Sequence, residues 1–241
     1  MTLRTTLSTP DGKRRYVREL FTTIADRYDF ITAFLSYGQD RRWKVRLAEL
    51  AGVGPGMRAV DLACGTGDIG FALARRGADV VGIDVTFRML QLARRRIARR
   101  VDPPIATVTG DMARLPLANG VADVVSTGYG LRNVPDLVGA LGEMHRVLRP
   151  GGRLVALDFN RPESPLLRSA YLAYLTIVGG ALGWVLHRDP DTYRYIPESI
   201  RAYPGAHGVA RLMSAVGFID VRVVPLLGGL MAIHVATRGP V

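Results

Sequence analysis

The chain has 241 residues, of which 48% are hydrophobic and 22% charged. This is enough apolar material for one large folded domain, and it excludes a disordered or collagen-like chain. Its single cysteine, Cys64, excludes a disulfide framework and a four-cysteine zinc site.

The net charge is +11, because 32 lysines and arginines face 21 acidic residues. A global excess of this kind is weak support for a partner, and RNA-binding motifs with interleaved aromatic residues are missing. We therefore expect no nucleic-acid partner. The stretch from Met1 to Arg18 has no apolar core of a secretory signal, so we expect a cytoplasmic protein.

Helical periodicity opens the chain. Apolar residues between Tyr16 and Tyr28 have the spacing of one helical face, and Trp43, Leu47 and Leu50 continue the pattern. Glycine and proline at residues 54–56 then interrupt it. We predict an N-terminal helical segment over residues 16–52.

From residue 58 onward, expected strands and helices alternate. The strands are predicted over residues 58–63, 79–83, 105–109, 122–127 and 152–159. The helices are predicted over residues 68–76, 86–100 and 136–148. This rhythm indicates a parallel sheet with helices on both of its faces.

The rhythm breaks at residues 160–205, an apolar and tyrosine-rich insertion. A helix over 209–216 and two strands over 218–224 and 230–237 follow it. The connection at 225–229 is too short for a crossover, so these two strands must be antiparallel. Such a closing hairpin is not the arrangement of the nucleotide dehydrogenases.

Within the insertion, residues 169–186 carry no charge, and their 18 positions touch the lower bound for a membrane span. Gly179, Gly180 and Gly183 interrupt this stretch, and Arg168 and His187 flank it. We therefore expect a buried or interfacial helix pair rather than a transmembrane helix.

A glycine-rich loop follows the first predicted strand, in the sequence DLACGTGD (residues 61–68). Gly65 to Gly70 matches the pattern G-x-G-x-x-G, which dinucleotide-binding proteins and methyltransferases share. Such a turn lets a ligand lie against bare backbone at the start of a helix. Asp84, at the end of the second strand, is placed to accept hydrogen bonds from two ribose hydroxyls.

Asp61 separates the two classes, because a carboxylate just before the glycines repels a pyrophosphate but suits an ammonium or sulfonium group. S-adenosylmethionine combines a cationic amino acid end with a ribose and has no phosphate, so we predict it as the cofactor, with no metal. Asp111 and Met112 would supply an acceptor for the adenine edge and an apolar surface for its ring. The predicted cofactor-binding residues are Asp61, Gly65, Thr66, Gly67, Asp84, Val85, Asp111, Met112 and Gly128.

Three further stretches are more selective: SYGQDRRW (36–43), YGLRNV (129–134) and YRYIPESI (193–200). With them, the sequence resembles the UbiE/MenG family of quinone-biosynthesis C-methyltransferases from about residue 17 to residue 236. Departures are minor. The sequence DFNRP at 158–162 stands where the family commonly shows Glu-Phe-Ser-Lys-Pro, and Cys64 stands where many relatives have glycine.

The resemblance implies a class I methyltransferase fold in a single domain over residues 1–241. This fold is α/β and Rossmann-like, with a mostly parallel seven-stranded sheet, a terminal antiparallel hairpin and helices on both faces. Residues 160–205 would form a lid over the substrate. The implied reaction moves a methyl group from S-adenosylmethionine to a ring carbon of a demethylated isoprenoid quinol, which is demethylmenaquinol or a ubiquinone precursor. S-adenosylhomocysteine would be the second product.

Methyl transfer to a quinol carbon requires that a hydroxyl proton leave and that the resulting phenolate be stabilised. The candidate catalytic residues are Arg132, Asn133, Tyr193 and His234. Arg132 stays protonated, so electrostatic stabilisation suits it better than direct base chemistry. In the structural alternative, Arg132 and Asn133 cap the helix at Asp136 and pair with Glu143, while the tyrosines and histidines are packing residues.

Other functions stay open at this point. A methyltransferase of the same fold could act on a phospholipid amine or another small acceptor, and a non-catalytic scaffold in quinone synthesis is a third reading. A nicotinamide oxidoreductase is opposed by Asp61 and by the closing hairpin. The leading reading implies a lipophilic quinol substrate and peripheral contact with the inner face of the membrane. It leaves open whether the chain forms a homodimer.

Overall fold

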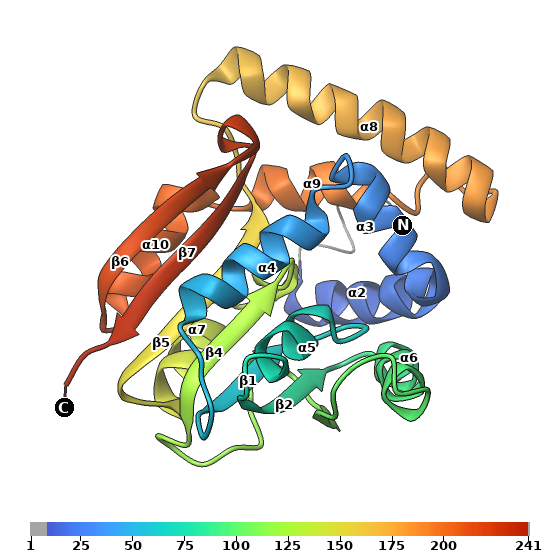
Figure 1. Cartoon of the computed structure of the whole chain (residues 1–241). Coiled ribbons are helices and arrows are strands. Elements are labelled where there is room, and N and C mark those ends of the chain that lie inside the picture. The colour runs from blue at the N-terminus through green and yellow to red at the C-terminus, as the bar shows by residue number, and fades with distance from the viewer. Residues whose placement is uncertain (1–8, 241) are drawn as a thin grey trace.

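The computed structural model describes residues 9–240 and contains a seven-stranded sheet of order β3-β2-β1-β4-β5-β7-β6 (Figure 1). Strand β7 is antiparallel to both of its neighbours, and the other pairs are parallel. The strands are β1 (Arg58–Leu62), β2 (Asp79–Asp84), β3 (Ala106–Thr109), β4 (Ala122–Gly128), β5 (Leu148–Phe159), β6 (Phe218–Leu226) and β7 (Met231–Arg238). The predicted mixed sheet with its closing antiparallel hairpin is confirmed.

Helices cover both faces of the sheet. They are α2 (Pro10–Ile24), α3 (Tyr28–Leu35), α4 (Asp40–Ala51), α5 (Asp68–Ala74), α6 (Phe87–Ala98), α7 (Leu137–Val147), α8 (Pro165–His187), α9 (Tyr195–Ala202) and α10 (Gly205–Ala215). Short 3-10 turns complete the chain: η1 (Ala25–Arg27), η2 (Leu131–Asn133) and η3 (Leu227–Gly229). In Figure 1, α4 and α5 lie in front of the sheet, and α7 and α10 lie behind it.

Strand alternation divides the core into two layers. On β1, Val60 and Leu62 pack with residues of α7 and α10, whereas Ala59 packs with residues of α4 and α5. Side chains of successive strand residues point to opposite faces, and both faces are buried here. This explains why the strands are continuous apolar runs rather than alternating ones.

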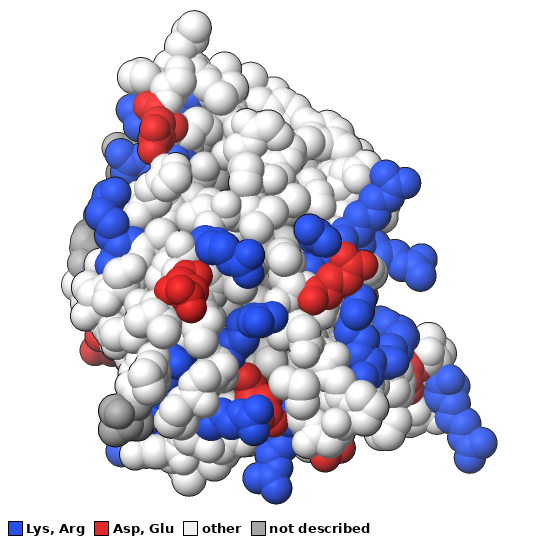
Figure 2. Space-filling model, turned by 60° about the vertical axis from the view of Figure 1, so that its left-hand side comes forward, with Lys and Arg blue, Asp and Glu red and all other residues white. Residues whose placement is uncertain are grey.

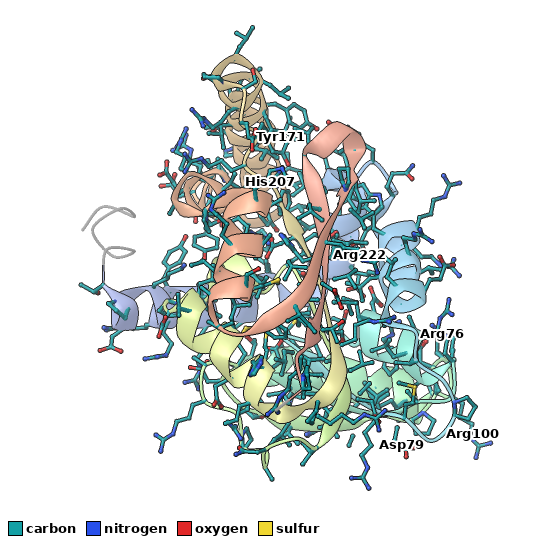
Figure 3. The ribbon with its side chains drawn as sticks, turned by 90° about the vertical axis from the view of Figure 1, so that its left-hand side faces the viewer. Arg76, Asp79, Arg100, Tyr171, His207 and Arg222 are labelled. Atoms are coloured by element: carbon teal, nitrogen blue, oxygen red, sulfur yellow. The ribbon has the colours of Figure 1, made fainter. Side chains whose placement is uncertain are left out.

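All strands except the antiparallel β7 direct their carboxyl ends toward the side of the sheet where α8 lies. In the side view of Figure 3, Tyr171 of α8 lies near one end of the molecule, and Arg76, Asp79 and Arg100 lie at the opposite end. The strand order reverses between β1 and β4, since β2 continues on one side and β5 on the other. In open α/β sheets, the crevice at such a reversal is where ligands bind.

The insertion differs from its prediction. Helix α8 is continuous from Pro165 to His187, so the helix pair expected there is wrong. Its glycines allow close approach instead of ending the helix: a Cβ on Gly183 would lie 2.5 Å from the carbonyl oxygen of Asp189. On Gly179, it would lie 3.3 Å from the carbonyl oxygen of Tyr193. The segment after α8 thus packs against the helix backbone.

Candidate active site

Two adjoining cavities open at the carboxyl ends of β1, β2 and β4. The smaller, called here the loop cavity, spans about 720 Å³ with its open mouth, and the larger, the aromatic cavity, about 1120 Å³. Phe21, Tyr28 and Tyr129 line both of them. Molecules bound in the two cavities would therefore meet at these three rings.

The loop cavity gathers most of the predicted cofactor residues. Six of them lie in its wall: Gly65, Asp84, Val85, Asp111, Met112 and Gly128. The remaining three, Asp61, Thr66 and Gly67, are not part of this wall. Their contact with a ligand stays a prediction, and the structure gives each of them a role in holding the loop.

Asp61 shares a face of β1 with Ala59 and is fully buried behind the loop. Its Oδ2 accepts a hydrogen bond from the Gly70 amide at 2.9 Å, and its Oδ1 accepts one from Ser126 Oγ at 2.7 Å. Burial raises the pKa of Asp61 to about 7, although these two donors oppose the rise. Asp61 therefore ties the first turn of α5, which directly follows the loop, to strand β4.

Thr66 and Gly67 fix the path of the loop into α5. The Thr66 hydroxyl donates to Asp29 Oδ1 at 2.7 Å. Gly67 has a φ of +95°, and a Cβ there would lie 2.6 Å from the Phe71 ring. Only glycine accommodates both the left-handed backbone and this close contact.

Asp84 faces the loop cavity from the end of β2. Its two oxygens accept hydrogen bonds from the amides of Gly65, at 2.9 Å, and Thr86, at 2.7 Å. Each carboxylate oxygen has two acceptor positions, so both can still accept a ligand hydroxyl. Burial raises the pKa of Asp84, and the two amide donors oppose the rise.

Helix α2 closes the loop cavity from the outside. Lys13 Nζ donates to the carbonyl oxygens of Arg132, at 2.9 Å, and Val134, at 2.7 Å. Arg14 Nε lies 3.2 Å from Asp111 Oδ2. Arg14 is the only cationic side chain among the described residues of this wall, and its partner is an acid.

This donor set fits S-adenosylmethionine. The wall offers carboxylate acceptors for hydroxyls and for an adenine edge, the apolar side chains of Met89 and Met112, and bare glycine backbone. A pyrophosphate would need cations or free helix amides, and the one cation of the wall is already paired. This wall therefore suits a nucleoside better than a dinucleotide.

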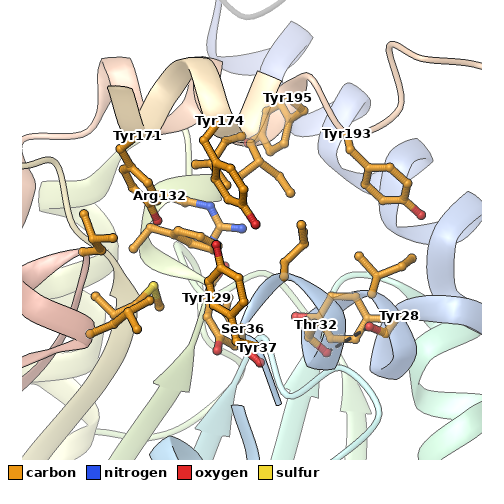
Figure 4. A pocket seen from close by; sticks show the side chains of 18 of the residues that line it. Tyr28, Thr32, Ser36, Tyr37, Tyr129, Arg132, Tyr171, Tyr174, Tyr193 and Tyr195 are labelled. Carbon is orange, nitrogen blue, oxygen red and sulfur yellow. Dashed lines mark hydrogen bonds between the residues drawn. The ribbon is translucent and has the colours of Figure 1, made fainter. Parts of the chain in front are cut away.

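The aromatic cavity lies between α2, α3, α8 and the segment before α9 (Figure 4). Its tyrosines are Tyr28, Tyr37, Tyr129, Tyr171, Tyr174, Tyr193 and Tyr195. The rest of the wall is mainly aliphatic, and among its described residues there is no carboxylate, histidine or lysine. Such a wall suits a flat apolar molecule with hydroxyl groups.

Arg132 is the one charged side chain among the described residues of this wall. Its Nη1 donates to Asp158 Oδ1 at 2.7 Å and to the Tyr129 carbonyl oxygen at 3.1 Å. Its Nε is buried without a hydrogen-bond partner among the described residues. Burial alone would lower the pKa of Arg132, but the Asp158 carboxylate raises it, so the guanidinium stays charged.

The structural alternative for Arg132 and Asn133 is wrong. Glu143 pairs with Arg146 at 2.6 Å, and Asp136 caps α7 itself by accepting from the Gly139 amide at 2.9 Å. Asn133 lines the loop cavity. Its Nδ2 donates to the Tyr129 carbonyl oxygen at 2.7 Å, and its Oδ1 accepts from the Tyr195 hydroxyl at 3.0 Å.

The other two candidate catalytic residues, Tyr193 and His234, lie in different parts of the structure. Tyr193 lines the aromatic cavity, and its hydroxyl lies 2.8 Å from His187 Nε2. Burial raises the pKa of Tyr193 to about 12. His234 lies in neither wall; its Nε2 is 2.8 Å from the Ala206 carbonyl oxygen inside the core. The prediction of His234 as catalytic is corrected accordingly, because strand β7 turns its ring toward α10.

Several wall residues were not predicted from the sequence as site residues. Tyr28 and Phe21 looked like the apolar face of a helix, and Tyr129 lies in a selective stretch without having been assigned a role. Tyr171 and Tyr174 face the cavity from the uncharged stretch of helix α8, residues 169–186. Tyrosine at helical spacing in an apolar stretch was the available signal for them.

The sequence profile of the ubiE/COQ5 methyltransferase family matches residues 9–238. The chain belongs to this family. It is 40% identical to the demethylmenaquinone methyltransferase of Mycobacterium sp. (strain KMS) over 233 residues, covering 97% of this chain and 98% of the relative. It is also 40% identical to the demethylmenaquinone methyltransferase of Thermus thermophilus over 221 residues, covering 91% of this chain and 100% of the relative.

Solved structures support the fold. A SAM-dependent methyltransferase of Thermotoga maritima superposes with a TM-score of 0.66 at 19% identity, covering 92% of this chain and 99% of that one. A SAM-dependent methyltransferase of Aquifex aeolicus gives 0.56 at 15% identity, covering 95% and 98%. The protein is a class I methyltransferase that depends on S-adenosylmethionine.

Proposed function

We propose that this ubiE/COQ5-family enzyme methylates a ring carbon of demethylmenaquinol. The carrying observation is the aromatic cavity, which joins the loop cavity at Phe21, Tyr28 and Tyr129 and has the Arg132 guanidinium in its wall. Relatives at 40% identity over nearly their whole length are named demethylmenaquinone methyltransferases, which supports a naphthoquinol over a ubiquinone precursor.

We assign the loop cavity to S-adenosylmethionine. Asp84 would accept the ribose hydroxyls, Asp111 the adenine edge, and Met112 would pack on the ring, with Gly65 and Gly128 allowing close approach. The bound cofactor supplies an electrophilic methyl group and leaves as S-adenosylhomocysteine. The buried carboxyl group of Asp61 lies behind the loop. Its state of ionisation would set the electrostatic potential at the cationic end of the cofactor.

The protein's own contribution is orientation and charge stabilisation. Aromatic walls exclude water and hold the flat acceptor with its carbon in line with the methyl group. As the quinol hydroxyl loses its proton, negative charge develops on the oxygen and on the ring carbon. We assign the stabilisation of this oxyanion to the Arg132 guanidinium, which Asp158 and the Tyr129 carbonyl already hold in place.

We also infer a membrane-facing surface for the isoprenoid tail. Helix α8 is long and apolar enough to cross a membrane by length and composition, with 33% of its most apolar window buried. Its outward face carries no charge; the members are Leu166, Ser169, Ala170, Ala173, Ile177, Ala181, Trp184 and Val185. In Figure 2, the upper part of the molecule, where α8 lies, is largely white.

Helix α3 extends this apolar surface. Phe30 and Phe34 are 57% and 51% exposed, and their stacked rings have centroids 6.2 Å apart. Both α3 and α8 also line the aromatic cavity with their inner faces. A peripheral position on the inner face of the membrane would let a quinol enter between bilayer and cavity without crossing water.

A phospholipid amine is a weaker acceptor for this cavity, because no carboxylate among the described wall residues could hold its ammonium group.

Mass spectrometry of quinones from a deletion strain tests the proposal. Demethylmenaquinone should accumulate, and the wild-type gene should restore menaquinone. Accumulation of a ubiquinone precursor, or an unchanged quinone pool with altered phospholipids, would overturn it. Light scattering on the purified protein tests whether a homodimer forms.

A further inference from the structure

The described residues that line the aromatic cavity include no carboxylate, histidine or lysine, although the proposed reaction must release a proton. A quinol and S-adenosylmethionine together yield the methylated quinol, S-adenosylhomocysteine and one proton. The described side chains of the wall that could handle this proton are tyrosine, serine and threonine hydroxyls and the permanently charged Arg132. The acceptor must therefore lie behind one of these hydroxyls.

Tyr129 connects the cavity to a buried carboxylate. Its ring lies at the junction of the two cavities, and its hydroxyl donates to Asp40 Oδ1 at 2.6 Å. Asp40 Oδ2 lies 2.6 Å from Lys44 Nζ, and Lys44 Nζ lies 2.8 Å from Asp68 Oδ2. Only 7% of Asp40 is exposed.

Asp40 also borders a separate polar groove on the protein surface. This groove is lined by charged residues: Asp29, Asp40, Arg41, Lys44, Asp68, Arg75, Arg76, Arg96 and Asp102. The carboxylate of Asp40 joins this groove to the aromatic cavity through its hydrogen bond from Tyr129. One carboxylate therefore lies between a water-excluding cavity and a surface where water can take up a proton.

We propose that Asp40 is the proton acceptor of the methyl transfer and that it receives the proton through the Tyr129 hydroxyl. This inference rests on the proposed quinol substrate. The quinol O–H bond breaks and its proton passes to Tyr129 Oη, while the Tyr129 proton passes to Asp40 Oδ1. The ring carbon forms its bond to the methyl group as the sulfur–methyl bond breaks. The carbon then loses its hydrogen as a proton, the quinol oxygen regains one, and Asp40 releases one proton to the groove.

Two other carboxylate or imidazole groups are worse placed. Asp158 is 1% exposed, and it accepts from Arg132 Nη1 at 2.7 Å and from the Phe159 amide at 2.8 Å, with no route to water. His187 contacts Tyr193, which lines the aromatic cavity but not the loop cavity where the methyl group arrives. Tyr129 lies at that junction.

The surroundings of Asp40 suit a group that passes a proton on. Lys44 of the same helix, Tyr28 of α3, Asp68 of α5 and Tyr129 are the titratable groups that face it. Lys44 Nζ lies 2.6 Å from Asp40 Oδ2, so Oδ1 is the oxygen of Asp40 that faces the Tyr129 hydroxyl. Burial and Asp40 raise the pKa of Tyr129, which keeps its hydroxyl protonated as a carrier.

The test uses the full-length enzyme with demethylmenaquinol in detergent–lipid vesicles. It compares four single variants, Asp40→Asn, Tyr129→Phe, Asp68→Asn and His187→Gln, and the double variant Asp40→Asn/Tyr129→Phe. Asp40→Asn removes the acceptor, Tyr129→Phe removes the carrier, and Asp68→Asn is the matched control. Asp68→Asn takes one carboxylate from the same Lys44 but leaves the Tyr129–Asp40 contact in place. Single-turnover methyl transfer, its solvent isotope effect and S-adenosylmethionine affinity are measured for each.

Asp40→Asn and Tyr129→Phe should each slow methyl transfer about a hundredfold, the usual scale of a lost proton acceptor, with cofactor affinity within about threefold. The double variant should be no slower than the slower single variant, because both act on one route. The rate of Asp40→Asn should increase with pH as solvent removes the quinol proton. Asp68→Asn should remain near the wild-type rate and pH profile.

Equal losses in Asp40→Asn and Asp68→Asn would show that Asp40 only holds Lys44, and would overturn the proposal. A loss of methyl-transfer rate in His187→Gln alone would also overturn the proposal, because it would make His187, behind Tyr193, the proton acceptor. The wild-type reaction is read in the same assay. If wild type does not methylate the quinol at all, the proposed function fails, whereas the relay is judged only from the ratios between variants.

Discussion

Replacing Arg132 separates its structural role from its chemical role. Arg132→Met keeps the length of the side chain and removes its charge, and it leaves the Asp158 carboxylate 1% exposed without its cation. Two backbone amides would still donate to Asp158, from Phe159 at 2.8 Å and from residue 132 at 3.2 Å. The variant therefore carries a buried charge that is hydrogen-bonded but not neutralised.

Breaking a buried ion pair from one side costs about 3–5 kcal/mol of unfolding free energy, out of a total of about 5–15 kcal/mol for a domain. At about 2–4 °C per kcal/mol for a chain of this size, the melting temperature should fall by roughly 6–20 °C. Adding Asp158→Asn removes the stranded charge and should restore part of that loss. Arg46→Met is the control: its pair with Glu49 is about half exposed on both sides, and it should cost about 1 kcal/mol or less.

Denaturant unfolding measures the stability, and single-turnover methyl transfer measures the chemistry. The Arg132→Met/Asp158→Asn variant should be folded, should bind S-adenosylmethionine as wild type does, and should methylate demethylmenaquinol about a hundredfold more slowly, as when an oxyanion donor is lost. A folded double variant with the wild-type rate would refute the electrostatic role. Arg132 would then be a structural residue only.

Three further predictions concern the cofactor and the membrane. Asp84→Ala should weaken S-adenosylmethionine binding by about 1.5–3 kcal/mol, as for hydrogen bonds to a charged group; unchanged calorimetric affinity in a folded variant would exclude the ribose assignment. Ionised Asp61 attracts the cationic cofactor and protonated Asp61 does not, so affinity should increase as pH rises through about 7, and Asp61→Asn should lose this dependence. An identical pH profile in that variant would show that Asp61 has no electrostatic part in binding. Exposed Ile177 and Trp184, changed together to serine, should reduce liposome flotation and activity on a long-tailed quinol more than on a tailless one. Val138→Ser, at a 49% exposed apolar position of α7, should change neither; equal losses on both acceptors would make this face of α8 ordinary surface.

Local patterns predicted most of the fold. The apolar runs, the glycine loop and the short connection after β6 correspond to β1, the start of α5 and the β6–β7 hairpin. Each of these depends on neighbours within a few residues, so the sequence records them directly. The position of Asp84 also follows from local pattern, because the carboxyl end of a parallel strand lies at the edge of the sheet where the loop cavity opens.

Predictions that depended on packing from distant segments were less accurate. Glycines in α8 suggested a break, but they allow the chain near Asp189 and Tyr193 to approach the helix. His234 looked like a candidate base, yet strand alternation turns it into the core against Ala206. Asp40 and Tyr129 lie 89 residues apart in the chain, and no local pattern indicates that their side chains meet.

Methyl transfer to carbon is the central claim, and a labelled-methyl assay tests it most directly. Purified protein is incubated with S-adenosylmethionine carrying a deuterated methyl group and with reduced demethylmenaquinone in lipid vesicles, and the products are fragmented by mass spectrometry. We predict menaquinone with one labelled methyl group on the ring, in place of one ring hydrogen. Label on a hydroxyl oxygen or on a phospholipid nitrogen, or no transfer by protein that binds the cofactor, would contradict it.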